Sequence, residues 1–352
     1  VSLDRIPRSG GGAVTSTFNI RVLALPVPPT GPYQVVEEPQ SPVGGQFHQV
    51  RQGRLTDELI AVAFNSVWRS FNRGAGWQLM ASAPLAYDVA ADLNTSRLYL
   101  STRTAVVASD NDGASWDAAG FTNPGGSRTL YVQPGSPSTL WAATLVAGQI
   151  VLTSSRDRGQ MWTGLPPIPS PPQGAVPWEF AFHPAAPNRI FVGEDGQARL
   201  WATENAGLTW RQAFFTGGSR MPVRIAPSNP LRVYTSGGVS DDGGFSWRTS
   251  GVPNLIWAIV VHPLNADVAF YGSTNAFYYT KDGGQTWLSN LWPQTDTNAG
   301  EIEGMLVLPT GELVVGSCSI FISQGDLLTG AFSMRESAAG VKAIAYTDIR
   351  QA

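Results

Sequence analysis

One eight-residue pattern recurs six times along this chain of 352 residues and constrains the fold more than any other feature. Each copy, here called an octet, reads Ser or Thr, any residue, Asp or Asn, any residue, Gly, two free residues and Trp. Two examples are SDDGGFSW at 240–247 and TKDGGQTW at 280–287. Successive octet tryptophans lie 37 to 48 residues apart. A repeat of this length contains several secondary-structure elements and is typical of solenoids and β-propellers.

The residue types of the octet predict the tip of a β-hairpin. A short Asp or Asn side chain accepts hydrogen bonds from the backbone amides just ahead of it, and the Gly two positions later adopts the positive φ that closes the turn. The Trp then lies on the returning strand, where its ring can cover the turn and its indole N–H can donate to a carbonyl. We therefore expect a structural role for Asn72, Trp77, Asn111, Trp116, Asp157, Trp162, Asn205, Trp210, Asp242, Trp247, Asp282 and Trp287.

The residues between octets predict four strands per repeat. In residues 257–287 an apolar segment is followed by a Pro-containing turn, a second strand, a short turn and a third strand that enters the octet, and a fourth strand follows the Trp. Four antiparallel strands in about 40 residues form one blade of a β-propeller. Residues 303–328 contain such strands with only a degraded tip at 323–326, and they count as a seventh blade. The prediction is an all-β, seven-bladed β-propeller with four-stranded antiparallel blades over residues 46–352.

The two ends of the chain differ from the repeats. No good inner strand precedes the first octet, and residues 341–349 (VKAIAYTDI) resemble the inner strands elsewhere, so we expect this C-terminal segment to close blade one. Residues 1–45 form an extended Gly- and Pro-rich N-terminal arm without an octet. Its segment 19–27 (NIRVLALPV) has the character of a strand that adds to an exposed sheet edge, either on the propeller's own flank or on a neighbouring protein.

Composition excludes several classes of function. A net charge of −3 and a pI near 5.7 give no bulk attraction to nucleic acid or to an anionic membrane. No apolar run approaches the roughly 18 residues of a transmembrane helix. Cys318 is the single cysteine, and His48, His183 and His262 are scattered, so we expect neither a metal site nor a cofactor. The chain starts at Val1 without a Met, which indicates either that a leader was removed or that the start was trimmed; a removed leader would make the protein extracytoplasmic (periplasmic or secreted).

The octets resemble the Asp boxes, also called BNR repeats, of sialidases, xyloglucanase-like glycoside hydrolases, sortilin-type receptors and a photosystem II assembly factor. The resemblance covers residues 58 to about 326 and implies a β-propeller, but such proteins include enzymes as well as binding proteins. Nearly complete octets in six blades resemble the photosystem II assembly factor more than the sialidases. This implies an accessory subunit of a membrane-associated assembly such as a photosynthetic complex, while a surface component of a virus particle fits the arm equally well.

A binding site is expected where the inner strands begin, at one mouth of the propeller's central channel. Two tryptophans with mixed charges around a cavity suit a sugar ring or a peptide. Alternatively, the charges pair with one another and the aromatic rings fill the channel. The channel-mouth candidates are Arg128, Trp178, Arg220, Trp257 and Glu301.

The alternative to a binding protein is a glycoside hydrolase or a glycan-binding propeller. A retaining sialidase uses a Tyr nucleophile with a Glu, an Asp acid–base and arginines, and Tyr87, Glu179 and Glu303 have suitable residue types without a local motif. The sialidase-like Arg-Ile-Pro at 5–7 runs into Ser and three glycines rather than a strand. Xyloglucanase-like enzymes place their two catalytic acids on two propellers, and this chain is long enough for one. We therefore predict a non-catalytic protein-binding or structural subunit that contacts other proteins through its N-terminal arm and propeller rim.

Overall fold

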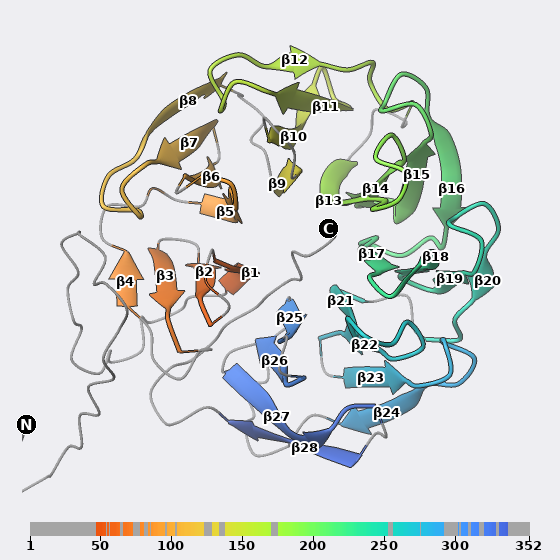
Figure 1. Ribbon diagram of the computed structural model, residues 1–352. Coiled ribbons are helices and arrows are strands. Elements are labelled where there is room, and N and C mark those ends of the chain that lie inside the picture. The colour runs from red at the N-terminus through yellow and green to blue at the C-terminus, as the bar shows by residue number, and fades with distance from the viewer. Residues whose placement is uncertain are drawn as a thin grey trace, which may run out of the picture. The chain divides into compact units, whose positions relative to one another are not determined.

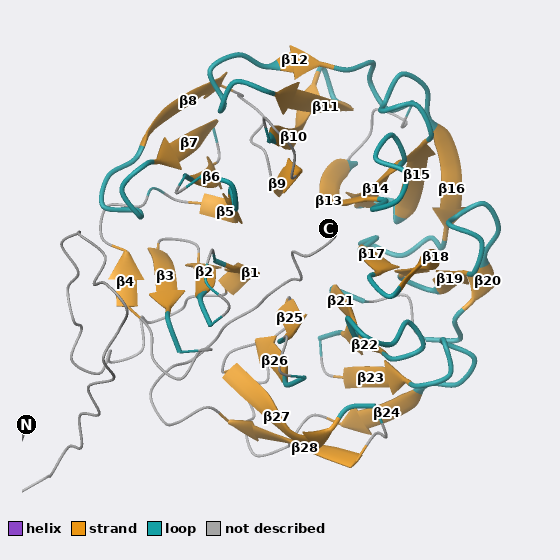
Figure 2. Cartoon of the chain, viewed as in Figure 1, coloured by secondary structure: helices purple, strands orange, loops and turns teal. Residues whose placement is uncertain are grey.

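The computed structural model describes most of residues 47–336. Gaps fall at 54, 56, 64–65, 73–77, 81–83, 85, 96, 103, 123–128, 134–137, 170–174, 253–255, 275, 292–301, 303, 309–310, 317–319 and 329–330. The N-terminal arm (1–45) and the expected closing strand (341–349) lie outside the described residues. The described part of the chain consists of strands, turns and loops (Figure 2). It contains no helix of the length and apolar character needed to cross a membrane.

The described strands form seven four-stranded antiparallel sheets, each built from four consecutive strands. In chain order, the first three sheets contain β1 (Phe47–Gln52), β2 (Leu59–Ala63), β3 (Ser66–Ser70) and β4 (Gln78–Met80); β5 (Ala86–Ala91), β6 (Leu98–Thr102), β7 (Ala105–Ser109) and β8 (Asp117–Thr122); and β9 (Thr129–Gln133), β10 (Thr139–Val146), β11 (Gln149–Ser155) and β12 (Thr163–Gly164). The next two contain β13 (Val176–Phe182), β14 (Ile190–Asp195), β15 (Arg199–Thr203) and β16 (Arg211–Phe215); and β17 (Val223–Ala226), β18 (Asn229–Thr235), β19 (Gly238–Ser240) and β20 (Arg248–Thr249). The last two contain β21 (Ala258–Val261), β22 (Ala269–Gly272), β23 (Ala276–Thr280) and β24 (Leu288–Leu291); and β25 (Gly304–Val307), β26 (Leu313–Gly316), β27 (Ile320–Asp326) and β28 (Ala331–Glu336).

The sheets are arranged as the blades of a propeller, with the first strand of each sheet innermost (Figure 1). Each inner strand contacts the inner strands of the two neighbouring sheets, and β25 contacts β1, so the ring of inner strands closes on itself. Closure leaves no exposed edge between the first and last sheets. The expectation of an all-β propeller with four-stranded antiparallel blades is confirmed.

The hydrophobic core lies between neighbouring sheets. Ile60 of the first sheet packs with Val89 and Leu98 of the second, and similar clusters follow around the ring. One large cluster joins Trp68 of the first sheet to Phe270 of the sixth and Leu313 of the seventh. Because burying one such apolar side chain stabilises a fold by roughly 1.5–3 kcal/mol, each sheet depends on its two neighbours for most of its stability.

The first sheet corrects one sequence-based expectation. Its inner strand is β1 (Phe47–Gln52), which pairs along its length with β2, so the inference that no inner strand precedes the first octet is wrong. The prediction failed because four of the six residues of FHQVRQ are polar, whereas the other inner strands are mostly apolar. A β-bulge between Phe47 and Gln49 further breaks the alternation of the strand. The four described strands of this sheet are thus consecutive in the chain, as in the other sheets.

The octets form the tips between the third and fourth strands of their sheets. In the five octets whose glycines are described, these glycines have φ between +78° and +88°, and the residues before them have φ between +56° and +76°. The first Ser or Thr accepts a hydrogen bond from the glycine N–H at 2.8–2.9 Å. The Asp or Asn Oδ1 accepts one from the amide four residues later at 2.9 Å. The predicted turn chemistry is therefore present in each of these five copies.

The octet tryptophans cover the turns but differ in their hydrogen bonding. The Trp162 Nε1–H donates to the carbonyls of Ala119, at 2.9 Å, and Gly159, at 3.0 Å. The Nε1 atoms of Trp116, Trp210, Trp247 and Trp287 are buried and have no hydrogen-bond partner among the described residues. The expectation that each indole finds a carbonyl is thus met by Trp162 and not by these four, whose contribution is the apolar ring. Trp77 lies in a gap of the described chain.

Candidate functional site

Three of the predicted channel-mouth residues meet in one stack. The guanidinium carbon of Arg220 lies 4.1 Å from the ring centroid of Trp178 and 3.5 Å from that of Trp257. The three residues come from three consecutive sheets, at or just before the starts of β13, β17 and β21. An arginine over an indole face gains roughly 0.5–2 kcal/mol from the ring quadrupole, depending on its exposure. The stack therefore joins these sheets on the face where their inner strands begin.

A β-bulge and a side-chain hydrogen bond orient the two indole rings of the stack. The register of β13 against β14 shifts between Pro177 and Glu179, which makes Trp178 the extra residue of a β-bulge. Such a bulge bends a strand and re-aims a side chain. The Trp257 Nε1–H donates to the Thr274 Oγ1 at 3.1 Å, which fixes the plane of this indole. The positions of both indoles thus follow from the strand ends that carry them.

Asp195 contacts Arg220 through both its side chain and its backbone. Its Oδ2 lies 3.6 Å from the Arg220 Nε, and the two residues also form an isolated antiparallel bridge through their backbones. Sequence reasoning missed Asp195 because it ends β14, an outer neighbour of the inner strand, far from Arg220 along the chain. The signal available in the sequence was the Glu-Asp-Gly at 194–196, which marks the turn after β14.

The candidate catalytic residue Glu179 links two sheets. Its carboxylate is buried and forms an ion pair with Arg224 of β17. Its Oε2 also accepts a hydrogen bond from the Val223 backbone N–H at 3.3 Å. Arg224 in turn donates to the Val223 carbonyl at 2.8 Å. With both carboxylate oxygens held by the next inner strand, Glu179 is placed to join β13 to β17.

A second acidic residue makes the same kind of link two sheets earlier. Asp88 in β5 is fully buried, and its Oδ2 accepts a hydrogen bond from the Leu130 N–H of β9 at 2.9 Å. A bulge between Ala86 and Asp88 places the candidate Tyr87 at the position that Trp178 occupies in β13. An aromatic residue followed by an acid at the start of an inner strand is thus a repeated structural feature. The recurring pair of an aromatic residue and an acid was visible in the sequence, but by itself it does not show that the acid bonds to the next inner strand.

The remaining predicted residues fall in gaps. Arg128, Glu301 and Glu303 lie outside the described residues, so the structure says nothing of their contacts. Across the part of the chain that is described, no group of three or more His, Cys, Asp and Glu side chains is arranged to hold a metal ion.

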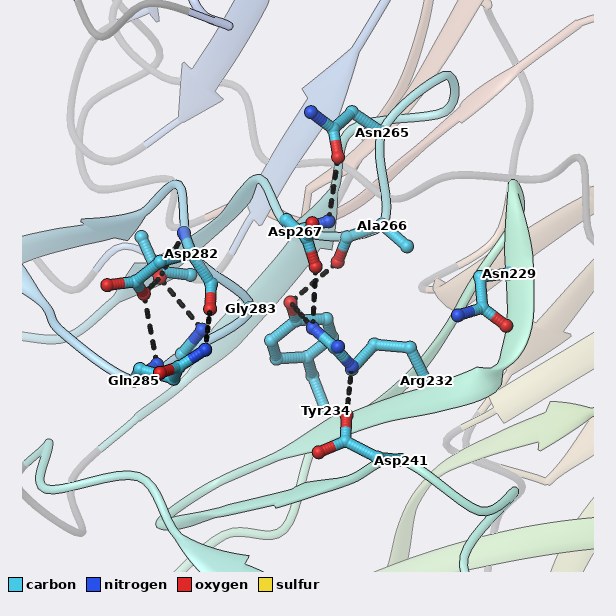
Figure 3. Close-up of polar contacts among 12 residues, drawn as sticks. Asn229, Arg232, Tyr234, Asp241, Asn265, Ala266, Asp267, Asp282, Gly283 and Gln285 are labelled. Carbon is cyan, nitrogen blue, oxygen red and sulfur yellow. Dashed lines mark hydrogen bonds and ion pairs between the residues drawn. The ribbon is translucent and has the colours of Figure 1, made fainter.

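A separate polar network joins the octet of the fifth sheet to the turn after β21 in the sixth (Figure 3). Arg232 forms ion pairs with Asp241, in the octet of its own sheet, and with Asp267 of the next sheet, at 3.0 Å between Nη1 and Oδ1. The Tyr234 hydroxyl donates to the Ala266 carbonyl at 2.6 Å. Burial of this phenol, opposed by the nearby Arg232, raises the pKa of Tyr234 to about 12. The network therefore ties two neighbouring sheets together.

Comparison with known proteins identifies the fold and no family. A scan against protein-family models finds no match, and a search of curated proteins finds none either. The structure is similar to that of a GH74 enzyme from Niastella koreensis, with a TM-score of 0.55 and 15% identity over 85% of this chain and 60% of that chain. It is also similar to the GH74 xyloglucanase from Xanthomonas campestris, with a TM-score of 0.63 and 18% identity over 88% of this chain and 56% of that chain.

This chain therefore spans less than two thirds of the length of either of these enzymes. At such low sequence identity, the two likenesses establish a common propeller fold, and function has to be argued from the site.

Proposed function

We propose that this protein is a non-catalytic binding propeller that serves as a protein-binding or structural subunit of a larger assembly. One observation carries this proposal: Glu179, a candidate catalytic acid, is buried in an ion pair with Arg224 and accepts a hydrogen bond from the Val223 N–H. A hydrolase of this type needs a carboxyl group that can approach the glycosidic oxygen and exchange a proton with it. In this protein the carboxylate of Glu179 instead bonds to Arg224 and to the backbone of the next inner strand.

The finer features of this proposal rest on the sequence. The octets resemble Asp boxes, and their number supports a role close to that of the photosystem II assembly factor, on an extracytoplasmic, membrane-associated complex. The N-terminal arm (1–45) supports contact with a partner protein, because its segment 19–27 has the pattern of an edge-adding strand. Removing residues 1–45 should then leave the propeller folded and abolish co-purification with that partner.

The second candidate function is a glycoside hydrolase. The likeness in fold to two GH74 proteins, one of them a xyloglucanase, favours it, as do the half-buried rings of Trp178 and Trp257 beside an arginine. Aromatic rings with a few polar groups are typical of sugar sites. In this protein, however, Arg220 lies against both indoles.

Activity measurements separate the two functions. The wild-type protein is incubated with fluorogenic sialosides and with xyloglucan oligosaccharides, in parallel with a Glu179→Gln/Glu303→Gln variant and an exposed-site control, Glu204→Gln. Circular dichroism establishes that all three proteins are folded at the assay temperature. We expect no turnover in any of them. Turnover by the wild type and the control that disappears in the double variant would show that the protein is a hydrolase.

A further inference from the structure

His262 is a buried histidine whose ring closes a turn. It directly follows β21, and 4% of the residue is exposed. Its Nδ1 accepts a hydrogen bond from the Leu264 backbone N–H at 3.2 Å. An Nδ1 that accepts a hydrogen bond carries no proton, so the ring is neutral and its proton lies on Nε2. The conformation of the turn after β21 therefore depends on the protonation state of this imidazole.

The turn after β21, residues 262–268, is held by hydrogen bonds that begin and end at His262. Its N–H donates to the Val268 carbonyl at 2.8 Å, and its carbonyl accepts a hydrogen bond from the Asn265 N–H at 3.3 Å. The bond to the imidazole holds the residue between them, Leu264, whose side chain projects into solvent and is 77% exposed. Loss of the imidazole acceptor would release the outermost part of this turn.

The same turn forms one side of the junction with the fifth sheet. Asp267 forms an ion pair with Arg232 of β18 at 3.0 Å, and the Ala266 carbonyl accepts a hydrogen bond from the Tyr234 hydroxyl at 2.6 Å (Figure 3). A change in the conformation of the turn would therefore reach the fifth sheet through both of these contacts.

The seventh sheet lies on the other side of the sixth. Val260 and Val268, which flank the turn, belong to one buried apolar cluster with Leu327, the residue after β27. Burial, opposed by the negative charge of Asp326 at the end of β27, lowers the pKa of His262. Among the described residues, Asp326 is the charged group that acts on this ring. Its carboxylate favours the protonated ring, whereas the apolar surroundings and the Leu264 N–H favour the neutral ring.

His183 occupies the equivalent place after β13 and is buried to the same degree, with 5% of the residue exposed. Neither of its ring nitrogens accepts a hydrogen bond from the described backbone. Burial and the charge of Arg189 lower the pKa of His183, and the Pro230 carbonyl and Glu204 act in the opposite direction. Both histidines are therefore buried after an inner strand, but closure of a turn by the ring distinguishes His262.

We propose that His262 is a pH-sensitive switch that opens the turn after β21 when its ring takes up a proton at Nδ1. Both nitrogens of an imidazolium are donors, so the charged ring can no longer accept the Leu264 N–H. The charged ring is attracted to Asp326 of the seventh sheet, and the turn loses the bond that closes it. This device does not depend on whether the protein is a binding subunit or a hydrolase.

The direction of the pH effect follows from the lowered pKa. The ring takes up a proton more readily when the chain around it is open, so the stabilisation is fully present above the ordinary histidine pKa of about 6.5 and is lost as the pH falls below it. The pKa values of Asp242 and Asp282 are about 2, so these octet carboxylates stay charged between pH 7.5 and pH 5.

The test measures amide hydrogen exchange of residues 264–268 in the full chain by mass spectrometry at pH 7.5 and pH 5. The test variant is His262→Asn, because an Asn side-chain oxygen accepts a hydrogen bond without titrating. The same place after β5 shows the geometry, since the Asp92 Oδ1 accepts the Asn94 N–H at 3.0 Å. Comparing wild type and variant at the same pH removes the intrinsic pH dependence of exchange.

Two further variants complete the experiment. His183→Asn is the matched control, because it removes an equally buried imidazole that does not close its turn. His262→Ala removes the acceptor at every pH. Circular dichroism at both pH values establishes that all the proteins are folded.

The ratio of the wild-type exchange rate to that of His262→Asn should rise about fivefold from pH 7.5 to pH 5, the effect of losing one hydrogen bond. His183→Asn should exchange like the wild type, and His262→Ala should exchange fast at both pH values. The proposal is overturned if the ratio is the same at both pH values or if His183→Asn removes the response. Exchange of His262→Ala as slow as that of the wild type at pH 7.5 would also overturn it.

Discussion

Two consecutive residues in the left-handed region close each octet turn whose glycine is described. Gly244 is the second of these two residues in its octet, and both its backbone conformation and the crowding around it disfavour a side chain. Its φ is +88°, and a Cβ built there would lie 2.5 Å from the Cζ of Phe191, which is fully buried. Gly251 has a similar φ of +72° with no atom near the position of an added Cβ. Substitutions at Gly244 and Gly251 therefore separate the free-energy cost of a left-handed backbone from the cost of steric crowding.

We predict that Gly251→Ala lowers the free energy of unfolding by about 1 kcal/mol, because only the left-handed backbone is penalised. Gly244→Ala should lower it by about 2–4 kcal/mol, because the methyl group must also displace a packed ring. Denaturant unfolding of the two variants and the wild type measures both values. Equal effects of the two substitutions would show that Phe191 moves aside without cost.

The octet carboxylates make stability depend on pH. Burial, the largest single influence on Asp242, acts to raise its pKa, but hydrogen bonds from the Ser246 hydroxyl and amide, the Ser240 hydroxyl and the Phe245 amide together lower the pKa to about 2. Asp282 has the same arrangement, and its pKa is also about 2. A folded-state pKa below the unfolded value means stabilisation that is present above about pH 4 and lost as the pH falls towards 2.

Asp242→Asn should therefore lower the thermal unfolding temperature at pH 7, and the difference from the wild type should shrink between pH 4 and pH 2. Thermal melts at several pH values measure this difference. The octet of Asn205 provides the control, because its amide does not titrate and Asn205→Ser should give a difference that is independent of pH. A constant difference for Asp242→Asn would refute the role given to its charge.

Inner strands are joined to one another by buried acids as well as by apolar side chains. Asp88 holds the Leu130 amide of β9, and Glu179 holds both the amide of Val223 and the guanidinium of Arg224. Removing one member of a buried ion pair leaves the other charge without compensation, whereas replacing both by apolar groups can be nearly neutral. Substitutions of Glu179 and Arg224 are thus expected to have strongly non-additive effects on the free energy of unfolding.

We predict that Glu179→Gln lowers the free energy of unfolding by about 3 kcal/mol, because Arg224 stays buried and charged. Glu179→Leu/Arg224→Met should be closer to the wild type than either single substitution. A double-mutant cycle by denaturant unfolding measures the coupling between the two positions. Additive effects would mean that the two side chains do not depend on each other.

Closure of the ring makes the molecule a single cooperative body between its first and last described sheets. The contact between β25 and β1, and the cluster that includes Trp68 and Leu313, replace the two free edges that an open array would leave. Because the inner strand of the first sheet is β1, the segment just before residue 53 is part of this closure, whereas the arm before residue 46 is outside the described ring.

Removing residues 1–45 should leave the unfolding transition nearly as sharp as that of the full chain. Removing residues 1–53 takes away β1 and should broaden the transition and lower its midpoint, because β2 and β25 lose their neighbour. Thermal unfolding followed by circular dichroism compares the two deletions. Identical transitions would show that another segment replaces β1, and the C-terminal residues 341–349 are the candidate for that replacement.

Much of the propeller was predictable from residues that act over short distances. The Ser or Thr, the Asp or Asn and the Gly of an octet bond to one another within four residues, so the tips and the four-strand blades between them follow from local chemistry. The mostly polar β1 was not predicted because its place is decided by pairing with β2 rather than by its own pattern.

The sequence by itself determined the turns, the strand count of a blade and the aromatic and charged residue types at the starts of the inner strands. Only the tertiary structure decided which side chains pair: Arg220 with Trp178 and Trp257, Glu179 with Arg224, and, near the octets, Glu204 with Arg189 and Asp241 with Arg232. The physical reason is distance along the chain. These partners lie on different strands or on different sheets, and a charge or a ring specifies the kind of neighbour it favours but not which one the fold brings to it.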